Sequence, residues 1–210
     1  MFLVAVAVGV GFGAGDQYLG SLATPGLWTV SLSQLSAPWL LLPFAFGCSQ
    51  LRVNRAVSIG LVATVAGLFG YFLMTLGPFD PGHASLNLRA ARSVLLSNSW
   101  VIAGGLVTGP LYGFLGQRWR SRRAWTSAIL VAGAFCLEPL AETAAHRVFP
   151  GASTVWPLEV VVGLLLAAYF FVTGIAYRRS IDSQDRRLSP YPADERRRPA
   201  SLEAQDGSAL

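Results

Sequence analysis

Long apolar stretches alternate with short polar or arginine-containing segments from residue 2 to residue 177. A helix needs about 20 apolar residues to cross the hydrocarbon core of a bilayer, because each residue adds about 1.5 Å to its length. The pattern therefore predicts an all-α fold, a polytopic transmembrane helix bundle with six spans. The expected spans cover residues 2–22, 28–48, 56–79, 100–116, 124–145 and 155–177.

The second expected span, 28–48, is the least regular. Non-helical backbone at membrane depth is stable only where it contacts protein or lines a water-filled cavity, so this span is a candidate pocket wall. The alternative is that its polar first half lies in the headgroup layer. The residues that interrupt its apolar pattern are Ser31, Ser33, Gln34, Ser36, Pro38 and Pro43.

Two polar segments lie outside the spans. Residues 88–95 place apolar side chains on one helical face and arginines elsewhere, which is typical of a short amphipathic helix on a membrane surface. Residues 180–210 are polar and charged, with few aromatic or β-branched side chains, and this composition predicts a disordered tail. We therefore expect a transmembrane domain at 1–179 and a cytoplasmic tail at 180–210.

The charges support a membrane protein and orient the chain. Charged residues make up 13% of the sequence, against about 25% in a soluble domain. Of the 16 basic residues, all arginine, 13 fall in the tail or in loops on one side of the expected bundle. Because arginine accumulates on the cytoplasmic side, we expect a plasma-membrane protein with both termini in the cytoplasm. The net charge of +5 indicates anionic lipid headgroups as partners rather than nucleic acid.

Glycines recur at intervals of four in two of the expected spans. Gly105, Gly109 and Gly113 share one helical face, and so do Gly11 and Gly15. In lipid, small residues let two helix backbones approach closely, and van der Waals contact then holds the pair. These five glycines are therefore expected to pack helices together, within the bundle or against another membrane protein or a second copy of the chain.

The two halves of the chain resemble each other weakly. Tyr18 follows one glycine pair as Tyr112 follows the other, and Pro43 has a counterpart in Pro139. With three spans in each half, a true repeat would be a 3+3 inverted repeat, an arrangement frequent in transporters. The alternative is chance matching between apolar helices of low complexity.

Four carboxylates fall inside or at the ends of the expected spans, where such residues are rare and mark functional sites. Asp16, followed by Gln17, ends the first span, while Glu138 and Glu142 share a face of the fifth and Glu159 begins the sixth. In the expected topology all of them lie in the outer half of the membrane. They predict an outward-facing polar cavity that binds a small molecule, a cation or a proton. The alternative is that all but Glu138 are ordinary interfacial residues.

Catalytic and metal-binding motifs do not occur. The sequence contains neither a GxxxxGKS/T phosphate-binding loop nor an HExxH zinc motif, and it has only two histidines. Cys48 and Cys136 have no metal-ligand neighbours at useful spacing and are interpreted as small buried hydrophobic residues. We therefore expect no enzyme activity, no catalytic residues, no metal and no cofactor.

Two stretches, SAPWLLLPFAFG (Ser36–Gly47) and GPLYGFLGQRWR (Gly109–Arg120), resemble an uncharacterised family of small six-helix integral membrane proteins of high-GC Gram-positive bacteria. The likeness covers roughly residues 9–177 and excludes the tail. It implies fold and location but no activity. A looser, architectural likeness is to the substrate-binding membrane components of energy-coupling-factor vitamin transporters, and a likeness of fold does not carry function.

Two functions fit these patterns. A transport-related protein, either a carrier for a small solute or cation or the membrane binding subunit of a transporter, would use the irregular span and the outer acids. A non-catalytic scaffold or interaction subunit would need only the glycine faces and the tail. We favour transport. A pocket that reaches Glu138 would support it, whereas a solid core with one bare glycine stripe would support the scaffold.

Overall fold

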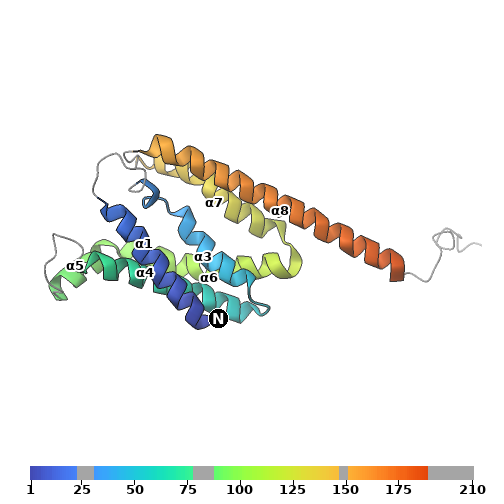
Figure 1. Cartoon of the computed structure of the whole chain (residues 1–210), viewed down its shortest axis with the longest axis horizontal. Coiled ribbons are helices and arrows are strands. Elements are labelled where there is room, and N and C mark those ends of the chain that lie inside the picture. Colours follow the sequence, from blue (N-terminus) through green and yellow to red (C-terminus); the bar gives the residue numbers. More distant parts are fainter. Residues whose placement is uncertain (23–30, 78–87, 147–150, 189–210) are drawn as a thin grey trace, which may run out of the picture. The chain divides into compact units, whose positions relative to one another are not determined.

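The computed structural model describes residues 1–22, 31–77, 88–146 and 151–188, and every regular element among them is an α-helix (Figure 1). The all-α prediction is confirmed for this part of the chain. The helices are α1 (Phe2–Ser21), α3 (Ala37–Cys48), α4 (Val53–Thr75), α5 (Leu88–Ser97), α6 (Ser99–Arg122), α7 (Trp125–Ala144) and α8 (Ala152–Leu188).

Five of these helices are long and apolar enough to cross a membrane: α1, α4, α6, α7 and, over Ala152–Ile181, α8. Large apolar side chains cover their outer surfaces, with Leu3, Phe69 and Leu165 each at least 60% exposed. Such surfaces are unfavourable in water and suited to lipid. The chain is therefore an α-helical membrane protein with several candidate spans.

The second expected span is not one continuous helix among the described residues. Its helix, α3, has 12 residues, which gives a length of about 18 Å against the roughly 30 Å of a hydrocarbon core. The backbone leaves helical geometry at residues 33–36, and residues 28–30 lie outside the described part. Pro38 at the start of α3 has a fixed φ that suits the first turn of a helix, so the helix begins afresh there.

Other boundaries differ from expectation at arginine-rich ends. α6 continues to Arg122 and α8 to Leu188, both beyond the expected span ends at residues 116 and 177. Arginine and glutamine are good helix formers, so a helix can run on past its apolar stretch. Residues 180–188, expected in a disordered tail, are therefore helical, and residues 189–210 lie outside the described part. The amphipathic helix expected near residue 90 is α5.

The chain divides into two compact units, residues 1–170 and 171–210. All packing and all sites described below belong to the first unit. The described part of the second unit is the C-terminal portion of α8.

Glycines allow the helices of the first unit to pack closely. α1 and α6 pack on α4, and α3 packs on both α4 and α6 (Figure 1). A Cβ atom at Gly13 would collide with the carbonyl oxygen of Gly67, and one at Gly113 would collide with that of Ala56. The backbones therefore touch at these positions, as small residues permit in membrane helices.

Of the two glycine faces expected from the sequence, the one on α6 packs against another helix and the one on α1 does not. Gly109 and Gly113 lie against α4, and a Cβ at Gly105 would be 3.1 Å from the Leu68 side chain. Added Cβ atoms at Gly11 and Gly15 would meet nothing within 4 Å. On α1 the packing glycines are instead Gly9 and Gly13, because a shift of two residues turns the helix by about 200°.

Aromatic side chains form a second packing centre, between α3, α6, α7 and α8. The Phe170 ring lies 5.8 Å from that of Phe44 and 4.7 Å from that of Trp119, centroid to centroid and edge to face. Val131 is fully buried in the same cluster. Edge-to-face geometry is favourable because the positive ring edge meets the negative ring face. This cluster packs against the C-terminal half of α3, and the candidate site lies at its N-terminal end.

Candidate functional site

A cavity of about 580 Å³ lies among α1, α4, α6, the start of α3 and the non-helical segment before it. Its size falls within the range of about 300–1,000 Å³ that is usual for small-molecule sites. Most of the lining is apolar, with polar groups at intervals. The polar lining residues are Asp16, Gln17, Ser33, Gln34, Ser36, Thr64, Tyr71, Asn98 and Thr108.

Residues without side chains and an interrupted helix create this space. Gly104 and Gly105 line the cavity from α6 and leave it unfilled. The Leu35 N–H donates to the Leu32 carbonyl at 3.1 Å in a tight turn, after which the chain turns into α3. The non-helical backbone at residues 33–36 has both protein and the cavity beside it.

Trp39 forms the central wall of the cavity. Its ring lies 5.2 Å from the Phe12 ring and 6.2 Å from the Tyr71 ring, edge to face in both pairs. Gly67 makes room for it, because a Cβ there would be 3.0 Å from the indole. The indole thus stands between α1 and α4.

Asp16 brings a carboxylate to this aromatic wall. The Trp39 indole N–H donates a hydrogen bond to the Asp16 side chain. Tyr71 is close enough to interact electrostatically with Asp16. No arginine or histidine is among the residues that line the cavity in the described part of the chain. An ionised Asp16 would therefore give the cavity a negative charge beside Trp39 and Tyr71.

The structure separates the predicted site residues into groups. Asp16 and Gln17 line the cavity, while Glu138, Glu142 and Glu159 are not among its lining residues. Glu159 is 3% exposed and its side chain interacts with that of Glu138. Glu142, one turn along α7, is half-buried. The sequence predicted one acidic cavity, but the structure separates these residues. Asp16 and Gln17 line the cavity, Glu138 and Glu159 form a pair elsewhere, and Glu142 stands apart from both.

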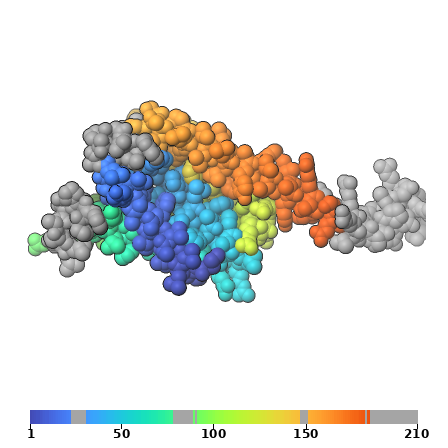
Figure 2. All heavy atoms as spheres, viewed as in Figure 1, coloured from blue at the N-terminus to red at the C-terminus, as the bar shows by residue number. Residues whose placement is uncertain are grey.

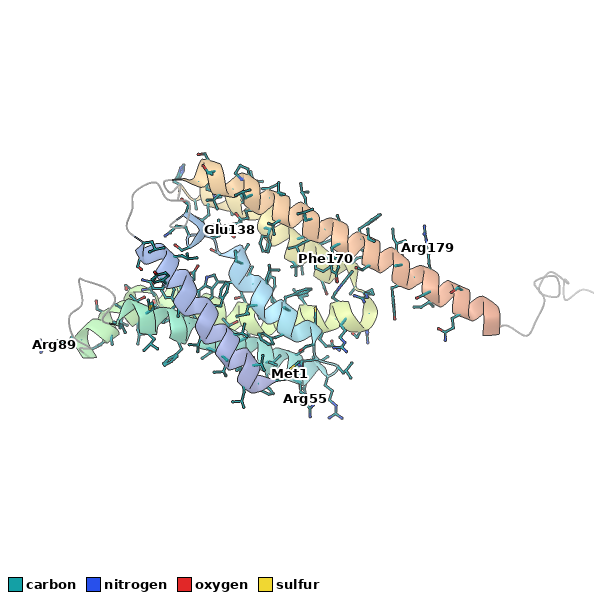
Figure 3. The ribbon with its side chains drawn as sticks, in the orientation of Figure 1. Met1, Arg55, Arg89, Glu138, Phe170 and Arg179 are labelled. Atoms are coloured by element: carbon teal, nitrogen blue, oxygen red, sulfur yellow. The ribbon has the colours of Figure 1, made fainter. Side chains whose placement is uncertain are left out.

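Glu138 caps α3 from another helix. Its two carboxylate oxygens accept the backbone N–H groups of Ser36 and Ala37, each at 2.5 Å. Figure 3 labels Glu138 near the start of α3. The first N–H groups of a helix have no partner within it and carry partial positive charge, so a carboxylate is the preferred acceptor. Ser36, at the N-cap position, makes no capping bond with its own side chain. Glu138 therefore fixes the segment that forms one cavity wall.

Several cavity residues were not predicted from the sequence. Thr64 and Tyr71 lie two turns apart on α4, and Asn98 precedes α6. Isolated residues of these types are common in membrane helices, so they gave little signal. Trp39 did give one, because it is the tryptophan that falls away from every predicted span boundary.

The fold and the cavity define an α-helical membrane protein with several candidate spans and a mostly apolar, solute-sized cavity that carries polar groups. Searches of protein-family models, curated proteins and solved structures found no match to this chain. Among the described residues, no three histidine, cysteine or acidic side chains gather as metal ligands.

Proposed function

We propose that this protein binds a small organic cation in the cavity and moves it across the membrane. It would act as a carrier or as the membrane-embedded binding subunit of a larger transporter. The observation that carries the proposal is the Asp16 carboxylate, set beside Trp39 and Tyr71 in a cavity whose described lining holds no basic residue.

The chemistry of the cavity wall favours a cation over other solutes. A cation over a tryptophan or tyrosine face gains about 0.5–1 kcal/mol at exposed sites and about 2 kcal/mol or more when desolvated. A carboxylate adds a charge-assisted hydrogen bond, roughly twice as strong as a neutral one. The side-chain amides of Gln17 and Gln34 line the cavity and can orient polar parts of the solute.

The interrupted segment before α3 also supports transport. Transporters commonly bind substrate near the midplane, where a helix is broken and half-helices meet. In this proposal α3 and the residues before it complete a sixth crossing of the plasma membrane. Both termini would then be cytoplasmic, and the two halves would form the 3+3 inverted repeat. We also propose that the chain belongs with the uncharacterised small six-helix membrane proteins that it resembles in sequence.

Binding can be tested on the purified full-length protein in lipid nanodiscs. The probes are organic cations of graded size, each paired with a neutral isostere in which carbon replaces the charged nitrogen, and the readout is the shift in melting temperature. We expect at least one cation to stabilise the protein while its neutral isostere does not. Equal shifts within every pair would contradict the proposal. Uptake of the selected cation into proteoliposomes then distinguishes a stand-alone carrier from a subunit that needs a partner.

A second candidate function, a scaffold in the membrane, is favoured by the bare face of α1. Figure 2 shows α1, in blue, at the surface, and nothing in the described chain approaches a Cβ built at Gly11 or Gly15. Glycine faces of this kind accept the backbone of another helix. Purification from native membranes tests this function, because Gly15→Leu should release a copurifying membrane protein that Gly133→Leu, also in open space, retains.

A further inference from the structure

A second polar site lies between α7 and α8, apart from the lining of the cavity. Glu159 of α8 is 3% exposed, and neither of its carboxyl oxygens has a hydrogen-bond donor among the described residues. Its side chain interacts with the Glu138 carboxylate of α7. One turn further along α8, Gly163 packs against Phe135 and Cys136, so the two helices are in close contact here.

The surroundings of this pair offer no compensating positive side chain in the part of the chain that is described. α7 contributes Glu138 and, one turn on, Glu142, and His146 follows the end of α7 at an exposed position. α3 contributes the backbone N–H groups of Ser36 and Ala37, and both bind Glu138. An ionised, unpartnered carboxylate in such a place would be strongly unfavourable.

The two carboxyl groups have unequal environments. Glu138 accepts two N–H groups at the positive end of a helix, so both of its carboxyl oxygens have a donor. Glu159 has no donor and lies beside that negative charge. Two adjacent carboxylates cannot both be ionised cheaply, and the one without donors is the better place for a proton.

We propose that Glu138 and Glu159 form a proton-binding site in which the proton resides on Glu159 and its O–H donates to Glu138. The inference does not depend on the proposed solute, because neither residue lines the cavity. Loss of this proton would set two negative charges side by side and weaken the hold of Glu138 on Ser36, which does line the cavity. The proton is thus a ligand that stabilises the cavity wall.

Infrared difference spectroscopy of the full-length protein in nanodiscs tests the site. At neutral pH the wild type should show the C=O stretching band of a protonated carboxyl group. Glu159→Gln should abolish that band and keep the wild-type melting temperature, because an amide imitates the neutral acid and can still donate to Glu138. Glu142→Gln and Asp16→Asn are the matched controls, and both should retain the band.

Three results would overturn the inference: no band in the wild type, a band that survives Glu159→Gln, or a band lost only in a control. The wild-type spectrum needs no variant to fold. Glu138→Gln provides a further check, since its amide would direct a donor at the N–H groups of α3. It should lower the melting temperature, whereas Glu159→Gln should not, and equal losses in the two variants would also count against the site.

Discussion

Asp16 is the one carboxylate among the described lining residues of the cavity, and its partners are aromatic. The carboxylate of Glu138 serves a different purpose, because there two backbone N–H groups use both carboxylate oxygens. Asp16, with one side-chain donor from Trp39, keeps acceptor capacity for a solute, while Glu138 holds a helix in place. What surrounds each acid therefore decides its role.

The capping role of Glu138 can be measured as stability. We expect Glu138→Ala to lower the free energy of unfolding by about 1–2 kcal/mol, because it leaves two N–H groups at the start of α3, one of them part-buried, without an acceptor. Denaturant titration in detergent is the measurement. Glu142→Ala, on the same helix without a described hydrogen bond, should change the value by no more than about 0.5 kcal/mol. Similar losses in both variants would show that Glu138 is not a special cap.

At the scale of elements, helix length and apolar pattern predict α1, α4, α6, α7 and the first part of α8 closely. The break before α3 is harder to predict, because its cap comes from a residue 102 positions away. Such a contact exists only once the helices have packed. Asp16 and Gln17 stood out because polar residues are conspicuous in an apolar span. Trp39 stood out as the tryptophan away from every predicted span boundary, whereas Tyr71, a residue type common in membrane helices, gave no such signal.

Packing between α1 and α4 gives a prediction with an internal control. Gly13→Ala should destabilise the protein by about 1–3 kcal/mol, because the new methyl group would collide with the backbone of Gly67 and force the helices apart. Gly11→Ala, two residues away in open space, should stabilise α1 by about 0.5–1 kcal/mol, since alanine favours a helix more than glycine does. Unfolding measured in one detergent compares the two. Equal effects would contradict this packing.

At the scale of the whole molecule, the arginines predict an orientation across the membrane. We expect an impermeant maleimide applied to intact cells to label a cysteine at Arg89→Cys and not one at Ser121→Cys, with Cys48 and Cys136 replaced by serine. Ser121 follows Arg118 and Arg120 in the segment expected in the cytoplasm. Lysed cells should label at both positions. Labelling of Ser121→Cys in intact cells would show that the topology is the reverse of the expected one, with the cavity toward the cytoplasm.

The central claim is that Asp16 makes the cavity selective for a cation, and calorimetry tests it most directly. The affinity of the best-binding organic cation is measured with the wild type, Asp16→Asn and Glu142→Gln, a matched loss of one carboxylate outside the cavity. We expect Asp16→Asn to weaken binding at least about tenfold, equivalent to about 1.4 kcal/mol, and Glu142→Gln to leave it unchanged. Unchanged affinity in Asp16→Asn, or an equal loss in both variants, would contradict a cation site in this cavity.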